Sequence, residues 1–371
     1  MTDFVIIGGG VYGAATAWLL STAGAEVCVL EARSVANRAS GGPGQRGVRA
    51  NGRDVRELTL MRRAYEIWPP LSERLEVEPL YKRTGQLLVA ETEAEVEQAK
   101  AQCWLQQNQG IDSEWLDQSA VRDREPNVSE AILGAIYCPN DGVANHAATT
   151  RAYAAAARRS GAVVSENTVA TELESHGDRI TAVRTTTGER FEASQGVLVL
   201  ANSAVQSLLS NWLTLPVWNG VFQVLISTPL AEMPFHHLVG HMSRPVSLKP
   251  EAGSRIMISG GWPGVWNSEA QEGYPVQASI EGNVAEAVRV FPGLQGLNVE
   301  TADASHQESL SIDGIPIIDR VDEFANLYYA TGWCGHGWAI APAVAELLAQ
   351  WAQEGDKPKA LEPFSYTRFM A

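Results

Sequence analysis

The feature that most restricts the fold of this chain is a glycine motif close to its start. Gly8, Gly10 and Gly13 have the spacing GxGxxG, between a β-branched apolar run at residues 4–7 and apolar residues at helical spacing over 11–23. An apolar run of this length is typical of a strand buried on both faces of a parallel sheet. The sequence therefore predicts a strand, a tight turn and a helix, which together are typical of dinucleotide binding.

Each glycine of the motif has a mechanical role. Gly8 permits the tight turn, Gly10 lets a pyrophosphate approach the backbone, and Gly13 lets the helix pack close to the strand. The start of the helix offers unpaired N–H groups and a positive dipole end to phosphates. Glu31 follows the next predicted strand, residues 26–30, and can accept hydrogen bonds from ribose hydroxyls. The alternative is a glycine-rich turn without a nucleotide, and the matching strand, helix and acidic residue argue against it.

The motif alone fits both NAD and FAD. Two features favour FAD: the motif lies at the very start of the chain, and Arg33 with a glycine-rich segment, residues 40–47, follows the acidic residue. Such a loop can wrap an extended and deeply buried cofactor. We therefore expect FAD.

The chain has 371 residues, which is long enough for two domains. After the first motif it alternates between two kinds of segment. Buried strands return at residues 196–201 and 327–330, while a charged segment and an aromatic, proline-rich segment interrupt them. We predict an α/β fold with a discontinuous Rossmann-like FAD-binding domain and an inserted mixed-sheet substrate domain. The first comprises residues 1–78, 140–210 and 310–371, and the second comprises residues 79–139 and 211–309.

Further elements follow from hydrophobic periodicity and turn residues. A long amphipathic helix is expected over residues 55–75, broken by Pro69-Pro70. The other predicted elements are helices at residues 93–109, 147–160 and 341–353, a strand at 84–90, and strands at 162–164 and 180–186 around a hairpin.

Composition excludes several classes of function. A net charge of −15 repels nucleic-acid phosphates and anionic lipid head groups, so we expect no nucleic-acid partner. The four cysteines show no metal-ligand spacing, so we predict no metal site and a reducing, cytoplasmic location. Asp3 and the three glycines make the apolar start unlike a signal peptide. No apolar run is long enough to predict a transmembrane helix.

A second glycine cluster lies near the C-terminus. Gly332, Gly335 and Gly337 fall between the strand predicted at 327–330 and the helix predicted at 341–353. Glycines at this spacing again indicate close approach of the backbone to a ligand. N–H groups there can hydrogen-bond the pyrimidine edge of a flavin and stabilise its anionic reduced ring.

With these motifs the chain resembles the D-amino-acid oxidase and glycine–sarcosine oxidase family of FAD enzymes. The matching segments are residues 6–13 with Glu31, 40–49, 311–318 and 332–342. The motifs near the C-terminus look most like β subunits of hetero-oligomeric amine dehydrogenases, including opine oxidase, proline dehydrogenase and sarcosine oxidase β chains. The resemblance implies hydride transfer from the amine-bearing carbon to the flavin, giving an imine that water hydrolyses. It also implies a partner subunit or a separate electron acceptor.

The resemblance carries a set of cofactor contacts onto this chain. Within it, Arg33 belongs to the adenosine and pyrophosphate site, Ser40 to a loop that passes under the flavin, and Val169 to the position whose backbone meets the adenine. The predicted cofactor-binding residues are Gly8, Gly10, Val11, Tyr12, Gly13, Glu31, Ala32, Arg33, Ser40, Gly41, Gly42, Gly47, Val48, Val169, Ala201, Gly332, Gly335, His336, Gly337 and Trp338.

The chain also departs from the family pattern. His306 stands where monomeric sarcosine oxidases have the cysteine that holds flavin covalently, and Ala339 where they have a carboxylate-binding lysine. Glu308 stands where glycine oxidases tend to have a carboxylate-clamping arginine. Residues 255–261 lack the lysine that promotes reaction with oxygen in monomeric sarcosine oxidases. We therefore expect non-covalent FAD, and a dehydrogenase fits better than an oxidase.

Three residues are predicted to act on the substrate. Glu308 can hold an ammonium or guanidinium group or accept the amine proton, and a structural salt bridge is the alternative. Arg49 matches a basic residue near the flavin ring and can clamp a carboxylate, with bonds to backbone carbonyls as the alternative. Trp333 can form a wall of the site, and core packing is the alternative. No catalytic triad is expected, because the flavin carries the chemistry.

Histidines raise two further hypotheses. His236, His237 and His241, with Lys249 nearby, lack a helical register, so surface or satisfied histidines are favoured over metal ligands. One of the three can line the substrate pocket. His146 stands where sarcosine oxidase β chains carry a second, covalent FMN, and a second FMN within a complex is a minority hypothesis.

The sequence thus predicts a flavoenzyme that oxidises an amino acid, an opine or an N-alkyl amino acid, as the catalytic β-type subunit of a larger complex. Two alternatives stay open. One is a 2-hydroxy-acid dehydrogenase on the same scaffold, which Glu308 disfavours because a carboxylate suits a cationic substrate. The other is a flavin-bearing subunit whose partner performs the chemistry.

Overall fold

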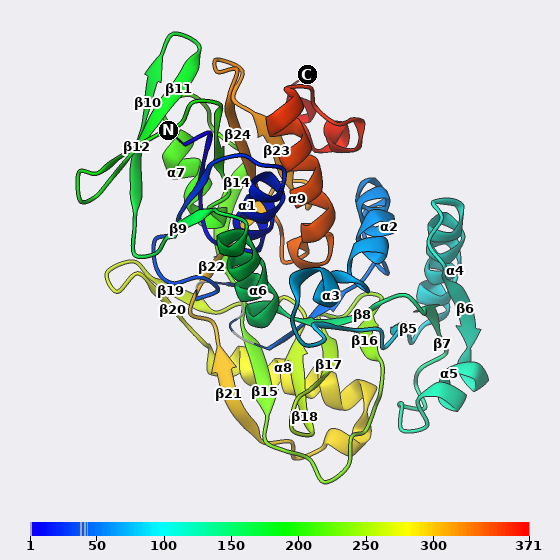
Figure 1. Cartoon of the computed structure of the whole chain (residues 1–371). Helices are drawn as coiled ribbons and strands as arrows, with labels where there is room; N and C mark the ends of the chain where they lie inside the picture. The colour runs from blue at the N-terminus through cyan, green and yellow to red at the C-terminus, as the bar shows by residue number, and fades with distance from the viewer. Residues whose placement is uncertain (1, 38, 41, 43, 371) are drawn as a thin grey trace.

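The computed structural model describes residues 2–370 other than 38, 41 and 43 (Figure 1). One of its two large sheets has six strands, in which each neighbouring pair is parallel except the pair at one edge. The strand before the glycine motif, β1, lies inside this sheet and is fully buried. In order across the sheet the strands are β23 (Ile317–Arg320), β24 (Leu327–Thr331), β13 (Gly196–Val199), β1 (Phe4–Ile7), β2 (Val27–Leu30) and β9 (Val163–Ser165).

Helices pack on one face of this sheet. Ile6 and Val29, which point to that face, belong to one apolar cluster with alanine-rich helix surfaces. Small side chains let α1 pack against both α6 and α9, and α2 packs against α9. These helices are α1 (Val11–Thr22), α2 (Leu58–Ile67), α6 (His146–Arg159) and α9 (Gly337–Glu354).

A three-stranded antiparallel sheet covers the other face. Val5 and Ile7, which alternate with Ile6, form a second apolar cluster with Leu173 and Ile180. The strands of this covering sheet lie at the upper left of Figure 1. They are β10 (Ala170–His176), β11 (Arg179–Thr185) and β12 (Arg190–Glu192), and α7 (Val205–Leu209) adds to the same cluster.

The second large sheet has eight strands and is mixed. All of its neighbouring pairs are antiparallel except β16 and β5, which are parallel. One face packs against α8 (Gln277–Val290) in a third apolar cluster. In order the strands are β21 (Val299–Asp303), β15 (Val224–Ser227), β18 (Arg255–Ser259), β17 (Ser247–Glu251), β16 (Leu238–His241), β5 (Gln86–Ala90), β7 (Gly134–Cys138) and β6 (Glu114–Asp117).

Smaller elements connect the two large sheets. β3 pairs with β8 and contacts both β17 and α9, so it bridges the two halves of the molecule. The smaller sheets are β3 (Gln45–Val48) with β8 (Gly142–Asn145) and β4 (Tyr81–Lys82), β14 (Val217–Val221) with β22 (Gln307–Ser311), and β19 (Val265–Asn267) with β20 (Glu272–Tyr274). The other helices are α3 (Leu71–Leu75), α4 (Glu93–Asn108), α5 (Gln118–Arg124), η1 (Val55–Glu57), η2 (Asn202–Ala204), η3 (Pro292–Leu294), η4 (Lys359–Phe364) and η5 (Tyr366–Phe369).

The architecture has the predicted α/β class, with a discontinuous Rossmann-like sheet and an inserted mixed sheet. The residue boundaries of the two predicted domains stay a prediction, and one strand pair crosses them: β4 of the predicted substrate domain pairs with β8 of the predicted FAD-binding domain. Among the residues that the structure describes, no helix combines the length and apolar character needed to cross a membrane.

Three predicted elements differ from the observed ones in informative ways. The helix expected over residues 55–75 is split into η1, α2 and α3, and Pro70 caps α3. The strand expected at 162–164 is the edge strand β9, and the hairpin is formed by β10 and β11. α9 begins at Gly337 rather than at residue 341, because Trp68 Nε1 donates to Ala339 O (2.8 Å) and supports an earlier first turn.

Gly13 holds α1 close to the β1 turn. A Cβ at Gly13 would overlap the carbonyl oxygen of Gly8, whereas a Cβ at Gly10 would meet nothing within 4 Å. The backbone of Gly10 has φ −66°, which alanine adopts without strain. The two glycines of one motif therefore differ in what they do for folding.

We expect Gly13→Ala to lower the free energy of unfolding by about 3 kcal/mol, because the added methyl group forces α1 away from β1. Gly10→Ala is the matched control and should change this free energy by less than about 1 kcal/mol. Chemical denaturation followed by circular dichroism measures both variants. Equal stabilities would contradict the packing role of Gly13.

Candidate functional site

A cavity of about 1070 Å³ has walls from both large sheets. Its lining runs from the β1–α1 turn, past β3, to the segment before α9 and to the eight-stranded sheet. It brings together both glycine clusters, which lie more than 300 residues apart in the chain. The predicted site residues that line it are Gly8, Gly10, Val11, Tyr12, Glu31, Ala32, Ser40, Gly47, Arg49, Val169, Ala201, Glu308, Trp333, Gly335, His336, Gly337 and Trp338.

The turn between β1 and α1 forms one end of the cavity. Gly8 has φ +108°, and a Cβ there would lie 2.6 Å from the carbonyl oxygen of Leu200, so glycine is required. Gly10 caps α1 without a side-chain hydrogen bond, and the first turn of α1 contains no acidic residue. The positive end of the helix dipole and its N–H groups therefore stay available for an anion.

Glu31 organises this end of the cavity. Its carboxylate accepts hydrogen bonds from the backbone N–H of Gly9 (2.7 Å) and of Arg33 (2.9 Å). Its backbone carbonyl accepts from the N–H of Thr168 (2.8 Å), which brings Val169 to the cavity wall. A carboxylate has further lone pairs for ribose hydroxyls. Arg33 contributes through its backbone, and its side chain is not part of the cavity lining.

The segment before α9 forms another wall. Trp333 is 5% exposed and stacks on Tyr12, with ring centroids 3.8 Å apart, and the hydroxyl of Tyr12 donates to Gly337 O. Burial and two nearby arginines lower the pKa of His336 well below its usual value, so this imidazole is neutral. Arg53, which forms a buried ion pair with Glu57 (2.8 Å), donates to the carbonyl oxygen of His336 (2.6 Å). The N-terminus of α9 thus faces the cavity with no acidic residue in its own first turn.

Two arginines of β3 and the loop after it reach the cavity. Burial lowers the pKa of Arg46 to about 10 and that of Arg49 to about 10, so both are cationic at neutral pH. Arg49 Nη1 donates to Asn51 O (2.6 Å), which is the kind of backbone contact that the sequence left open as the alternative. Arg46 Nη1 donates to Met257 Sδ (3.3 Å), which ties β3 to the eight-stranded sheet.

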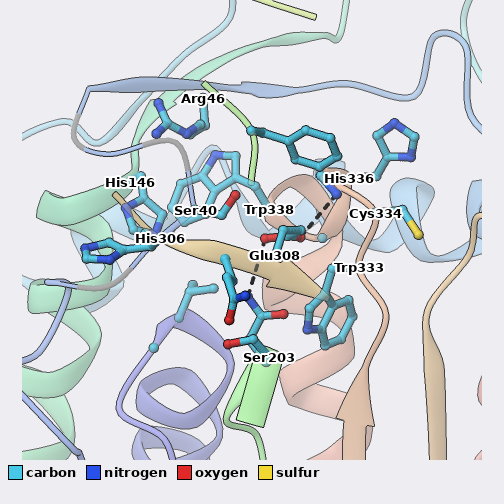
Figure 2. Close-up of a pocket in the computed structure, with 18 of the residues that line it drawn as sticks. Ser40, Arg46, His146, Ser203, His306, Glu308, Trp333, Cys334, His336 and Trp338 are labelled. Atoms are coloured by element: carbon cyan, nitrogen blue, oxygen red, sulfur yellow. Dashed lines mark hydrogen bonds between the residues drawn. The ribbon is translucent and has the colours of Figure 1, made fainter. Parts of the chain in front are cut away.

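Glu308 lies on β22 and is 7% exposed (Figure 2). Its carboxylate accepts from the N–H of Gly335 (3.1 Å) and from Asn202 Nδ2 (3.4 Å). Burial raises the pKa of Glu308, while these hydrogen bonds and one from Ser40 lower it. Glu308 forms no ion pair with a described side chain, so the structural salt bridge is absent there.

His146 and His306 lie near one another in the view of Figure 2. Burial lowers the pKa of His146 to about 3, and its ring packs against Trp338 with centroids 5.1 Å apart. His306 Nε2 is 2.8 Å from Asn37 O. His146 Nδ1, His306 Nδ1 and Trp338 Nε1 are buried without a hydrogen-bond partner, as expected where a polar ligand belongs.

Some predicted residues lie outside the cavity lining. Gly13 packs against the β1 turn, Val48 is in the core, and Gly332 and Gly42 have positive φ angles in flanking turns. Gly41 lies outside the described residues. Of the three clustered histidines, His241 lines the cavity, whereas His237 Nδ1 pairs with Glu125 (2.6 Å). No group of three His, Cys, Asp or Glu side chains in the described part of the chain could hold a metal ion.

Sequence reasoning missed the role of the eight-stranded sheet as a wall of the cavity. Lys249 on β17 is 5% exposed and lines the cavity, and its ammonium donates to Ser247 Oγ (3.1 Å) and Ser259 Oγ (2.8 Å). Burial and the nearby Arg46 and Arg49 lower the pKa of Lys249 to about 7. The sequence signal that could have revealed this wall is the alternation of polar and apolar residues within residues 211–309. The sequence pattern predicts these residues only as part of an inserted mixed-sheet domain.

The cavity fits an extended dinucleotide that carries a ring system. One end offers a helix N-terminus for a pyrophosphate and Glu31 for a ribose. Another wall offers the N–H groups of the first turn of α9 and several buried polar atoms without partners. These donors and acceptors match a flavin dinucleotide, whose ring has a polar pyrimidine edge.

Comparison with known proteins also indicates a protein that binds FAD. A family model described as FAD dependent oxidoreductase matches residues 3–351. The beta chain of a sarcosine oxidase from Arthrobacter sp is 27% identical over 388 aligned residues, covering 99% of this chain and 91% of that protein. One of the subunits of an opine oxidase from Agrobacterium tumefaciens (strain Ach5) is 27% identical over 383 residues, covering 100% and 98%. The resemblance that the motifs predict is confirmed.

Solved structures agree on the fold. The crystal structure of L-proline dehydrogenase from P. horikoshii matches with a TM-score of 0.89. It is 23% identical, and the match covers 99% of this chain and 97% of that one. The two-sheet architecture is therefore that of a solved fold.

We expect Gly10→Asp to weaken FAD binding about 30-fold, because a carboxylate at the start of α1 repels a pyrophosphate and occupies the positive dipole end. Gly10→Asn is the matched control, since asparagine has the same shape without the charge and caps helices well. Titration of the apoprotein with FAD, followed by quenching of flavin fluorescence, measures both affinities. Equal affinities in the two variants would contradict an anion site at α1.

Proposed function

Since the chain belongs to the family of FAD-dependent oxidoreductases, we propose that it oxidises the C–N bond of an amino acid, an opine or an N-alkyl amino acid. The relatives support this reaction, because those named above act on sarcosine, opines and proline. The observation that carries the proposal is one cavity lined by three features: the turn at the start of α1, the segment before α9, and the buried Glu308. The carboxylate of Glu308 has no ion-pair partner among the described residues.

The cofactor site is assigned to the two glycine clusters. Gly8, Gly10 and the start of α1 hold the pyrophosphate, and Glu31 holds the adenosine ribose. The backbone N–H groups of the first turn of α9, which begins at Gly337, would face the pyrimidine edge of the ring, next to Gly335, whose own N–H donates to Glu308. FAD bound there supplies the acceptor for two electrons, and no covalent link is expected.

Glu308 is assigned to the substrate amine. The amine must be neutral before the C–H bond next to it can give up a hydride. The raised pKa of Glu308 makes its carboxylate a better base, and no described arginine or lysine forms an ion pair with it. We therefore assign the proton that leaves the substrate ammonium to the carboxylate of Glu308.

Arg49 is assigned to the substrate carboxylate. One of its N–H groups bonds Asn51 O, and this bond fixes the guanidinium at the cavity wall. The remaining donors of a guanidinium can bind a carboxylate with two hydrogen bonds. Trp333 supports this wall through its stack on Tyr12, and a direct role for Trp333 in catalysis stays a prediction.

A partner subunit is part of the proposal. The Arthrobacter relative and the Agrobacterium relative are each named as one subunit of a larger enzyme, and each aligns along almost the whole of this chain. We therefore propose that this chain is the β-type subunit of a complex that passes electrons onward. A second flavin, FMN, at His146 stays a prediction.

The reaction is tested by anaerobic titration of the purified protein with amino acids, opines, N-methyl amino acids and 2-hydroxy acids. We expect an amine substrate to bleach the visible flavin band while 2-hydroxy acids do not. If only a 2-hydroxy acid bleaches the band, the electron donor is a hydroxy acid and not the proposed amine. A flavin band that no compound bleaches would contradict catalysis by this chain alone.

We expect Glu308→Gln to slow flavin reduction by the best amine substrate about 100-fold, because glutamine cannot accept the ammonium proton. In the unchanged protein the rate should rise with pH as Glu308 ionises, and the variant should lose this rise. Glu300→Gln makes the same change at an exposed glutamate of β21 and should leave the rate unchanged. Stopped-flow absorbance against pH measures all three proteins. If the rate of flavin reduction in Glu308→Gln still rises with pH, Glu308 is not the base.

A further inference from the structure

The eight-stranded sheet presents two chemically different faces. Leu87, Val239, Leu248 and Ile258 belong to the apolar cluster that packs against α8. Residues that alternate with them line the cavity: Gln86, Leu88, Gly240, Ser247, Lys249 and Ser259. Because alternate side chains of a strand point to opposite faces, the polar positions are built into the cavity wall.

The register of the strands places three polar side chains together at this wall. Ser247 on β17 pairs with Ser259 on β18, and Lys249 pairs with Met257 on β18. The ammonium of Lys249 donates to both serine hydroxyls, which uses two of its three N–H bonds. The third N–H bond is left for a ligand.

No carboxylate neutralises Lys249 within the described residues. Glu251, the nearest acidic group on its own strand, accepts instead from the backbone N–H of Gln45 (2.7 Å) and of Ala252 (2.9 Å). Arg46 and Arg49 add positive charge near Lys249. Buried cations are normally paired, so this wall is electrostatically incomplete without an anion.

Two glutamines at the same cavity wall, each two strands away from β17, also indicate a missing ligand. Gln86 is 2% exposed and its Oε1 has no partner, while Gln223 is 0% exposed and its Nε2 has no partner. Both residues line the cavity, on either side of the strand that carries Lys249. Unpaired polar atoms that are so deeply buried indicate a missing polar ligand.

Two arginines of the cavity lining already form ion pairs with carboxylates. Arg53 pairs with Glu57, and Arg244 pairs with Glu91 and Glu286. Arg49 is assigned above to the carboxylate next to the amine. With one substrate carboxylate assigned to Arg49, Lys249 is left for a second one.

We propose that Lys249, held by Ser247 and Ser259, binds a second carboxylate of the substrate. The substrate is then an amine with two carboxylates, such as an N-carboxyalkyl amino acid or an acidic amino acid. This inference rests on the proposed function, and it selects one substrate class from those named there.

Ligand binding to the flavin-loaded protein tests the inference without turnover. Succinate and glutarate are the dicarboxylate probes and butyrate is the monocarboxylate probe, each measured by calorimetry and by perturbation of the flavin spectrum. We expect Lys249→Met to weaken succinate or glutarate binding at least about 30-fold and butyrate binding less than about 3-fold. Lys100→Met makes the same change on the exposed surface of α4 and should alter neither affinity.

The charge of Lys249 also predicts a pH dependence. The charged groups around it are Arg46, Arg49 and Glu251, and His241 lies on the neighbouring strand β16 with a lowered pKa. Lys249 is cationic below its pKa of about 7 and becomes neutral above it. Dicarboxylate affinity should therefore fall as pH rises through this range in the unchanged protein, and Lys249→Met should lose this fall.

Two further measurements keep the outcome decisive. Thermal unfolding should show Lys249→Met to be no less stable than the unchanged protein, since it removes a buried unpaired charge. Lys249→Gln is measured beside it and should show the same selective loss. Equal weakening of dicarboxylate and monocarboxylate probes, or no weakening, would overturn the inference. Selective succinate binding in a protein that no amine reduces would instead refute the proposed reaction and leave the second anion site standing.

Discussion

The cavity depends on one contact between opposite ends of the chain. The ring of Tyr12 stacks on Trp333, and its hydroxyl donates to Gly337 O, so the first turn of α1 is fixed against the first turn of α9. Gly13 allows this by keeping α1 close to β1. Two helix N-termini consequently face one cavity, and neither has an acidic residue in its first turn. This geometry favours a ligand that carries negative charge at two separate points.

The electrostatics of the cavity oppose those of the whole protein. The chain has a net charge of −15, yet Arg46, Arg49 and Lys249 make the inner cavity cationic around Glu308. An acidic protein gains little from long-range attraction of anionic substrates, so recognition has to come from contacts inside the cavity. A buried guanidinium or ammonium interacts strongly there because water is excluded. Selectivity and affinity for carboxylates are then set by the same few residues.

The sequence predicted the parts of the fold that local rules determine. β1, α1 and β2 follow from an apolar run, three spaced glycines and a second apolar run, and each lies where the pattern indicated. Local rules were weaker where tertiary contacts decide. α9 begins at Gly337, ahead of Pro342, because Trp68 supports the turn from α2. Lys249 was named only as a neighbour of histidines, since its importance depends on pairing between β17 and β18, which no local pattern encodes.

In the proposed function, the two sheets divide the work of the protein between cofactor and substrate. The six-stranded sheet carries the assigned dinucleotide contacts at the end of β1, where Gly8 and Gly13 leave little freedom for substitution. The eight-stranded sheet carries Gln86, Ser247, Lys249 and Ser259 on strands whose opposite face is anchored by α8. A strand anchored on one face can exchange side chains on the other without losing its core packing. Substrate choice can therefore change along these strands while the cofactor site stays intact. The part of the substrate beyond the amine and the carboxylate assigned to Glu308 and Arg49 has to be sought on the inserted sheet.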